Sequence, residues 1–565
     1  MDPITLEVLW NRLIAVVNEQ ATALMNTSFT TIVRESGDLS AGVFDPRGNM
    51  IAQAVTGTPG HINSMATCIH YFLAEYPADT LRPGDVLITN DPHKTAGQLN
   101  DLTVITPVFR GDALVAFFGN TCHAIDIGGR GLGADARDMF EEGLFIPITK
   151  WYDAGTPNRE LEKIIVANVR QPEQVLGDIH AQIAGNDVGG ARLREMMDEF
   201  GLESLVPLAD EIITRSERAM RAAIAQVPDG VYTNEGYSDG FDAPVKMAVT
   251  ITKQGDEMTV DWSGTSPENP RGINVVLNYT HAYVTYAVKC ALCPEVPNNE
   301  GSFRPVHVTA PPGCLLNALP PAPVAGRHIV GHFLPGIIFG ALAPVLPDRI
   351  IAEGAANIWN NQFSGRMPDG SSWALAYFLC GGMGARPMSD GLHTTAFPSG
   401  VMGVQVEIVE SLVPLLVHRR EITRDSGGPG QFRGGCGQTI EVSCRTGLPF
   451  TLGPLFDRTR VAARGYEGGG DGSYGAIILS DGAHLTDKSQ RVLAPDELLT
   501  MLLPGGGGYY DPFTRDVERV WDDVRDDFVS LDAARERYGV VIDPDSMTVD
   551  DDATIALRAT ARTSE

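Results

Sequence analysis

Four polar segments near the N-terminus constrain this chain most, because each sets Asp, His or Asn side chains among glycines and short apolar runs. They are residues 34–40, 60–65, 90–101 and 120–129. Polar groups in such a setting lie where strands end, and loops carry function there on a rigid frame. Imidazole and carboxylate groups from separate loops are the usual ligands of catalytic zinc, manganese or iron. We therefore expect the chemistry of this chain at a cluster of these segments.

The bulk composition fits a large globular protein and argues against several classes of partner. With 565 residues, 43% of them hydrophobic, the chain can form more than one domain with an ample core. Its formal net charge of −28 argues against a nucleic acid or an anionic membrane as partner, because phosphates bind clustered Lys and Arg. We expect no signal sequence and no membrane span. Eight cysteines, with Cys290 and Cys293 as the one close pair, favour a reducing, cytoplasmic location.

Hydrophobic periodicity predicts an α+β fold with several domains and mixed sheets. A helix is expected from Pro3 to about Asn26, with Asp2 as its N-cap and leucines at helical spacing. Short apolar runs between turn residues predict strands, and longer periodic stretches predict helices. The expected strands are residues 41–44, 85–89, 102–109 and 113–118, the expected hairpin is 245–262, and further helices are expected within 158–226 and 517–538.

Shifts in composition divide the chain into four expected regions. They are an N-terminal α+β domain with the candidate site (1–226), a mixed α/β middle region (227–365), a glycine-rich β-containing region (366–515), and a C-terminal helix with an acidic tail (516–565). In the glycine-rich region, Gly428-Pro-Gly430 looks like a phosphate loop. No lysine or helix start follows it, so a structural turn is favoured.

A series of motifs in a fixed order runs over nearly the whole chain. The motifs are residues 2–8, Asp38-Leu-Ser, the His61 segment, Asn90-Asp-Pro, and residues 123–129, 142–147, 170–172, 425–435 and 504–509. In these motifs the chain resembles the hydantoinase B/oxoprolinase family. That family includes subunits of ATP-dependent hydantoinases and lactamases, domains of 5-oxoprolinase, and subunits of acetone and acetophenone carboxylases.

The resemblance implies a metal-bearing subunit that works with a hydantoinase A-like, ATP-binding subunit in a heterotetramer or larger assembly. The implied reaction is ATP-dependent ring opening of a small cyclic amide, such as a hydantoin, a lactam or oxoproline, after the partner has phosphorylated it. A G-x-x-x-x-G-K-[S/T] loop is absent from this sequence, which agrees with ATP being bound by the partner. Two alternatives stay open: a subunit of an ATP-dependent ketone carboxylase, and a non-catalytic scaffold subunit.

The family pattern, carried over residue by residue, places a divalent zinc, manganese or iron ion on Asp38, Gln98, Asp101 and His123. Gln98 departs from the pattern, because many relatives have histidine there and an amide oxygen is a weak ligand for zinc. Three arrangements remain open. The other three residues hold the metal with water in the open position, or His93 or His61 supplies the missing imidazole, or the site is metal-poor.

His61 and Asp126 are the predicted catalytic residues. His61 is expected to orient a ligand or to shuttle protons near neutral pH. Asp126 is expected to orient a ligand or to hold the Ile-Gly-Gly turn that follows it. Cys122 faces away from the site if its segment is a strand, so we expect no thiol nucleophile. From residue type alone, Asp38 and Asp101 also fit loop caps, and His123 fits a buried structural histidine.

Overall fold

An antiparallel seven-stranded sheet carries three of the four polar segments. The computed structural model describes residues 2–55, 58–356 and 358–562. The strands of this sheet are β1 (Leu39–Phe44), β2 (Met50–Gln53), β3 (Val86–Thr89), β4 (Asp101–Arg110), β5 (Ala113–His123), β6 (Thr149–Asp153) and β7 (Thr156–Pro157). Their spatial order is β2-β1-β5-β4-β3-β6-β7. The expected strands of this region are thus confirmed, with β5 extending five residues further than predicted.

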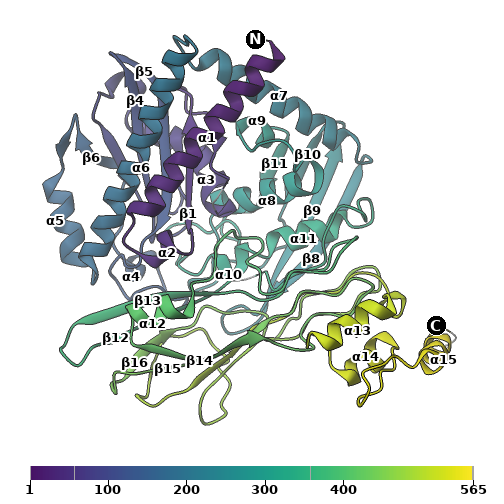
Figure 1. Cartoon of the computed structure of the whole chain (residues 1–565). Coiled ribbons are helices and arrows are strands. Elements are labelled where there is room, and N and C mark those ends of the chain that lie inside the picture. The colour runs from purple at the N-terminus through teal and green to yellow at the C-terminus, as the bar shows by residue number, and fades with distance from the viewer. Residues whose placement is uncertain (1, 56–57, 357, 563–565) are drawn as a thin grey trace.

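Helices cover both faces of this sheet (Figure 1). The first helix, α1 (Pro3–Thr27), begins as predicted, with the Asp2 carboxylate accepting from two backbone amides of the first turn. It packs with α6 (Pro172–Glu199) on one face, and α3 (Pro59–Glu75) packs on the other. Four more helices belong to this part: α2 (Thr31–Arg34), α4 (Met139–Glu142), α5 (Arg159–Asn168) and α7 (Val206–Ala225), with a 3-10 turn at Ala78–Thr80. Successive residues of β5 face opposite layers, as strand alternation requires.

A second, four-stranded sheet follows and confirms the predicted hairpin. It consists of β8 (Gly230–Ser238), β9 (Val245–Gln254), β10 (Glu257–Asp261) and β11 (Val306–Thr309). The strand order is β11-β10-β9-β8, in which β10 and β11 run parallel and the other neighbours run antiparallel. Its helices are α8 (Leu277–Leu292), α9 (Glu300–Phe303), α10 (His328–Gly331) and α11 (Leu334–Leu342). Residues of α8, α10 and α11 share a large hydrophobic core with this sheet.

Two more antiparallel sheets share a core below these layers (Figure 1). The first has the order β13-β12-β16-β18, and the second has the order β14-β15-β19-β17. The strands are β12 (Trp359–Arg366), β13 (Ser372–Leu379), β14 (Leu415–Ile422), β15 (Gln438–Cys444), β16 (Phe450–Gly453), β17 (Ala476–Ile478), β18 (Arg491–Leu493) and β19 (Leu499–Leu502), with helix α12 at Val406–Leu412. None of the helices in the described ranges combines the length and the apolar content that a bilayer crossing requires.

Glycine-rich segments between these strands pack backbone against backbone. They are residues 381–384, 427–435, 465–472 and 505–508. The Gly428 amide donates to the Gly506 carbonyl oxygen. This amide of the Gly428-Pro-Gly430 segment is therefore used within the protein and is not available to a phosphate. A Cβ atom on Gly382 would lie 1.8 Å from the carbonyl oxygen of Gly435, and one on Gly434 would lie 2.0 Å from that of Gly506. Glycine is required because no side chain fits between these backbones.

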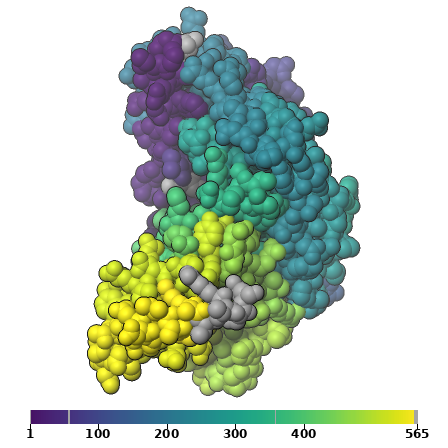
Figure 2. Space-filling model, turned by 90° about the vertical axis from the view of Figure 1, so that its right-hand side faces the viewer, coloured from purple at the N-terminus to yellow at the C-terminus, as the bar shows by residue number. Residues whose placement is uncertain are grey.

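The C-terminal tail differs from the predicted single helix. It forms α13 (Val517–Arg525), α14 (Leu531–Tyr538) and α15 (Asp551–Arg562), preceded by a 3-10 turn at Pro512–Thr514. The break comes at Asp527, whose φ of +61° cannot continue a right-handed helix. Ser530 then caps α14 by accepting from the Ala533 amide. Figure 2 shows this segment in yellow as a lobe at one end of the molecule.

Candidate functional site

Three of the predicted residues lie in one row across the seven-stranded sheet. Asp101 begins β4 and His123 ends β5, and the two are direct partners in the antiparallel register. Asp38 precedes β1, whose Leu39 pairs with Cys122, and the His123 amide donates to the Asp38 carbonyl oxygen at 3.3 Å. Residues opposite each other on neighbouring strands point to the same face. Strand register therefore brings positions 38, 101 and 123 together.

Side chains of this row contact one another and His61 in the first turn of α3. His123 Nδ1 lies 2.9 Å from Asp101 Oδ1. His61 Nε2 lies 3.4 Å from Asp101 Oδ2, and His61 Nδ1 lies 3.6 Å from Asp38 Oδ1. Thr58 donates from its hydroxyl to Asp38 Oδ1 at 3.0 Å. Asp101 is wholly buried, so solvent screens these charges only weakly.

An arginine from a distant segment completes the group. Arg327, just before α10, pairs through Nη2 with Asp101 Oδ2, and the same nitrogen lies 3.3 Å from His61 Nε2. Its guanidinium lies 4.3 Å from the ring centroid of Tyr279. We call these five residues the strand-end cluster: Asp38, His61, Asp101, His123 and Arg327.

Arg327 is a site residue that the sequence motifs did not predict, although a signal for it exists. The segment Arg327-His328, followed by His332 at helical spacing, places three basic side chains in an otherwise apolar stretch. In the structure all three border the cavity beside the cluster. His332 Nε2 lies 3.4 Å from the hydroxyl of Tyr279, the same ring that lies against Arg327. Basic residues at helical spacing in an apolar run are thus useful site candidates.

Burial and paired charges set the protonation of the cluster. Burial opposes ionisation of Asp101, but Arg327 and His61 outweigh it and hold the pKa of this carboxyl well below its usual range. For His61, burial lowers the pKa, but the neighbouring carboxylates outweigh burial and raise it above the usual value. Burial and the Arg327 charge lower the pKa of His332 to about 3. The buried site therefore contains a permanent cation and an ionised carboxylate. It also contains two imidazoles, of which His61 has a raised pKa and His332 a lowered one.

Gln98 lies next to the cluster and contacts the segment that carries Arg327. Its Nε2 donates to the carbonyl oxygen of Ala325. Its Oε1 is buried and has no hydrogen-bond partner among the residues that the structure describes. This amide thus holds the loop before Arg327 and leaves one acceptor toward the cavity.

The donor set does not fit the predicted divalent metal. Asp101 already uses one carboxylate oxygen for His123 and the other for Arg327. A metal on Asp101 would adjoin the permanent charge of the guanidinium, and like charges repel strongly where screening is weak. Within residues 2–55, 58–356 and 358–562, no group of three or more His, Cys, Asp or Glu side chains is arranged to hold a metal. The metal set remains a prediction, and no step below depends on it.

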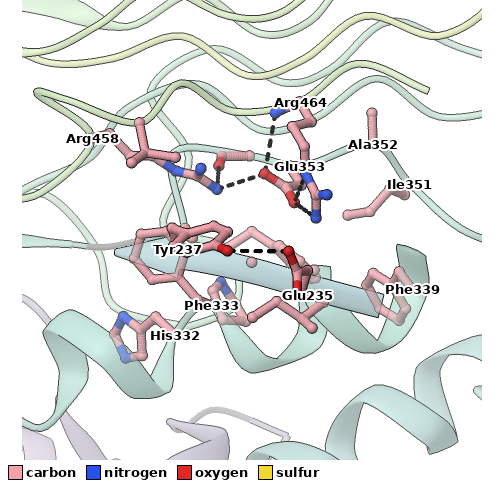
Figure 3. Close-up of a pocket in the computed structure, with 18 residues that line it drawn as sticks. Glu235, Tyr237, His332, Phe333, Phe339, Ile351, Ala352, Glu353, Arg458 and Arg464 are labelled. Atoms are coloured by element: carbon pink, nitrogen blue, oxygen red, sulfur yellow. Dashed lines mark hydrogen bonds and ion pairs between the residues drawn. The ribbon is translucent and has the colours of Figure 1, made fainter. Parts of the chain in front are cut away.

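A small cavity adjoins the cluster, and a larger cavity lies next to that one. The cavity at the cluster has about 30 Å³, room for about two water molecules at roughly 10–15 Å³ each. A larger cavity of about 230 Å³ lies beside it, and His332 borders both. Figure 3 shows Glu353 between Arg458 and Arg464 on one side of this larger cavity, with Phe333 and His332 across from them.

Charged and apolar walls face each other in the larger cavity. Glu353 pairs with Arg458 at 3.0 Å and with Arg464 Nε at 2.7 Å. Burial favours the neutral acid, but the two arginines outweigh it and lower the pKa of Glu353. Phe333 and Phe339 supply apolar surface. Such a wall suits a small ring with a polar edge, since ligand pockets combine apolar lining with few polar groups.

Two residues named in the sequence analysis lie away from the strand-end cluster. Asp126 accepts from the Gly128 amide at 3.0 Å and pairs with Arg170 at 2.8 Å, so it holds the predicted turn. His93 donates its backbone amide to Asp91. In the described part of the chain, neither Asp126 nor His93 lines the cavity at the cluster. His61 is therefore the imidazole that joins Asp38, Asp101 and His123.

Comparisons with known proteins agree over nearly the whole chain. A protein-family model described as hydantoinase B/oxoprolinase matches residues 2–512. A putative D-/L-hydantoinase subunit of the B type, from Pseudomonas sp. (strain NS671), is 32% identical over 590 residues, covering 99% of this chain and 98% of the relative. The match is therefore not confined to one motif or one sheet.

Two solved structures have a similar fold. The crystal structure of the ATP-dependent caprolactamase from Pseudomonas jessenii aligns with a TM-score of 0.89 and 28% identity, covering 99% of this chain and 100% of that chain. A nucleotide-free acetone carboxylase structure aligns with a TM-score of 0.87 and 20% identity, covering 100% of this chain and 83% of that chain. The second likeness concerns the fold alone. The α+β fold with mixed sheets is confirmed.

Proposed function

The chain belongs to the hydantoinase B/oxoprolinase family, and we propose that it is the ring-opening subunit of an ATP-dependent cyclic-amide hydrolase. Full-length similarity to a hydantoinase subunit and to an ATP-dependent caprolactamase supports this activity. Because that hydantoinase relative is named as one subunit of its enzyme, it also supports a hetero-oligomer with an ATP-binding partner subunit. Phosphate transfer from ATP belongs to that partner, and ring opening belongs to this chain.

One observation carries the proposal: a buried acid–base cluster borders a cavity for water and lies beside a cavity for a small ring. The strand-end cluster supplies an imidazole whose Nδ1 has no hydrogen-bond partner within the described residues. The adjoining cavity has about 30 Å³ and the next about 230 Å³. Water and base can therefore be held at the cluster, with the ring in the neighbouring cavity that His332 also borders.

The partner transfers the terminal phosphoryl group of ATP to the carbonyl oxygen of the cyclic amide. Water then adds to that carbon, the carbon–nitrogen bond breaks, and the nitrogen leaves as an amine after taking a proton. The product of this step is an acyl phosphate. A second water cleaves it to a carboxylate and inorganic phosphate, so one ring consumes one ATP and two waters.

His61 is the general base of this scheme. Its Nδ1, which makes no hydrogen bond within the described residues and lies 3.6 Å from Asp38 Oδ1, takes a proton from the attacking water, while Nε2 stays beside Asp101 at 3.4 Å. Asp101 also holds His123 through its Nδ1, which fixes the orientation of that ring. His61 lies at the N-terminal turn of α3, where the helix holds it rigidly under the sheet.

The test is turnover of hydantoins and lactams by the complex of this chain with its ATP-binding partner. The expected result is stoichiometric release of ADP and of the ring-opened acid, an amino acid from a lactam and an N-carbamoyl amino acid from a hydantoin. His61→Gln should be slower by about 10² to 10⁴-fold. His70→Gln is the matched control, because His70 is exposed on the same helix. Equal turnover of the wild type and His61→Gln would remove the catalytic role of this site and leave a scaffold subunit.

The same assay separates hydrolysis from carboxylation. Labelled bicarbonate is added, and the organic product is analysed for incorporated carbon. Ring opening with no incorporated label supports the hydrolase. A labelled product formed from a ketone would make this chain a carboxylase subunit instead.

A further inference from the structure

The strand-end cluster already contains a permanent positive charge. The Arg327 guanidinium is 3% exposed, pairs with Asp101 and lies 3.3 Å from His61 Nε2. A guanidinium stays protonated at any pH at which the protein is folded. Tyr279 supports it from one side with the face of its ring. Arg327 therefore occupies the position at Asp101 in which the family pattern places a cation.

The segment around Gln98 is shaped to receive this arginine. Gly97 has a φ of +87°, and a Cβ on it would lie 2.8 Å from Arg327 Cδ. Gln98 donates to the Ala325 carbonyl oxygen, two residues before Arg327. The Arg327 Nε donates to the carbonyl oxygen of Ala96. Three successive residues of one loop thus hold the arginine or its segment.

Glu142 fixes the same segment from another direction. One carboxyl oxygen accepts from the amides of Val324 and Ala325 at 2.6 and 2.8 Å. The Gly326 amide donates to the Gly272 carbonyl oxygen. The backbone before Arg327 is therefore held at each of three successive residues, which places the guanidinium with little freedom.

We propose that Arg327 replaces the divalent metal of this site, so that the protein holds its own cation and binds an anionic oxygen of the reacting amide or its phosphate. Gln98 is then a positioning residue for Arg327 and not a metal ligand. This explains why a weak ligand stands where the family pattern has histidine. Attack by water is driven by the His61 base, since a guanidinium does not generate hydroxide as a metal does. The oxyanion part of this inference rests on the proposed function; the metal part does not.

Metal analysis tests the proposal without any substrate. The purified complex is desalted without nucleotide, and zinc, manganese and iron are counted in the wild type and in His123→Ala. We expect below about 0.1 equivalent of each metal in both proteins. About one equivalent in the wild type that is lost in His123→Ala would overturn the proposal.

Restoring the family pattern gives the matched test. Gln98→His combined with Arg327→Gln removes the internal cation and adds an imidazole, so it should take up about one equivalent of zinc. Gln98→His alone should stay metal-poor, because Arg327 still occupies Asp101. A double variant that unfolds at the same temperature as the wild type and still takes up no zinc would refute the exchange of cation for metal.

Kinetics test the second half of the proposal. Arg327→Lys keeps the charge but cannot span Asp101 and a ligand oxygen, so kcat should fall about 10²-fold while KM for ATP stays unchanged. Unchanged kcat in a metal-free Arg327→Lys protein would overturn the oxyanion role. If the wild type opens no cyclic amide at all, the proposed function fails while the metal result stands.

Discussion

The strand-end cluster and a network beside the C-terminal tail both bury arginine against aspartate, yet they differ in the buried atoms that lack a hydrogen bond within the described part of the chain: in the tail network it is a donor, Arg515 Nε, and at the cluster they are acceptors. The tail network consists of Asp390, Arg433, Arg515 and Asp523. All four of its carboxylate oxygens accept from guanidinium groups at 2.6 to 3.2 Å. In the strand-end cluster, His61 Nδ1 is buried and makes no hydrogen bond to the described residues, although Asp38 Oδ1 lies 3.6 Å away, and the neighbouring Gln98 Oε1 makes none either.

This difference separates a structural role from a chemical one. A buried network whose carboxylate oxygens are all paired holds elements together, and here it ties α13 to the glycine-rich segment through Asp523 and Arg433. A buried polar atom without a partner costs free energy unless a ligand or water satisfies it. The strand-end cluster keeps such atoms facing a cavity, which is the arrangement expected of a site that acts on something else.

Asp101→Asn should produce the largest effect, which is a fall in turnover. Asn keeps the shape but loses the charge that holds Arg327, His61 and His123 in place. We expect kcat of the complex to fall about 10³-fold, measured by ADP release per folded complex. A fall of less than about tenfold would place Asp101 among the structural residues, like Asp523.

Glu142 should make stability depend on pH, because burial raises its pKa to about 8. The unfolded value is 4.5, so the folded state binds a proton more tightly than the unfolded state. This stabilisation is complete below pH 4.5 and is lost as the pH rises through about 8, at a cost of about 5 kcal/mol.

Glu142→Gln provides the check on that pH effect. The amide keeps an acceptor for Val324 and Ala325 but carries no charge, so this component of the pH dependence should vanish. Urea unfolding of both proteins at pH 5 and pH 9 measures it. Parallel pH profiles for wild type and variant would show that Glu142 is ionised in the folded protein.

Asp523→Ala should lower the stability of the protein and leave its turnover unchanged. It strips both arginines of a shared partner, although Asp390 still pairs with Arg515 at 2.6 and 2.8 Å. We expect a loss of about 3 kcal/mol in the free energy of unfolding, with kcat per folded complex unchanged. If kcat fell in a fully folded Asp523→Ala protein, the tail network would have a role in turnover as well as in stability.

Thr58→Val should give the smallest effect. It removes the hydroxyl that donates to Asp38 Oδ1 at 3.0 Å and leaves the side-chain volume nearly the same. One lost hydrogen bond to a carboxylate is worth about 1.5 kcal/mol, which corresponds to about a tenfold fall in kcat. Steady-state kinetics measure this, and a larger fall than that of Asp101→Asn would reverse the order of importance within the cluster.

The sequence predicted the part of the site that strand register creates. Asp38, Asp101 and His123 sit at the ends of adjacent strands, and alternation plus antiparallel pairing brings such positions into one row. The N-terminal helix and the hairpin at 245–262 were also predicted, because a cap, a proline and an alternating pattern are local signals.

Long-range contacts could not be predicted from the sequence. Arg327 is 226 residues from Asp101, and the two meet only because the segment before α10 packs against the loop of Ala96 and Gln98. The role of Gln98 followed from that same contact. In the tail, Val517, Val520 and Val524 gave a helical period, but the positive φ at Asp527 is not encoded in hydrophobic spacing.

The backbone-to-backbone packing of the glycine segments limits how this protein can evolve. Where a Cβ on Gly382 or Gly434 would meet a carbonyl oxygen within 2.0 Å, every substitution is selected against, whatever the new side chain offers. Such a region cannot drift toward a new specificity. Under the proposed function, a change of ring specificity would have to come from side chains that line the larger cavity, such as Phe339 and Ile351.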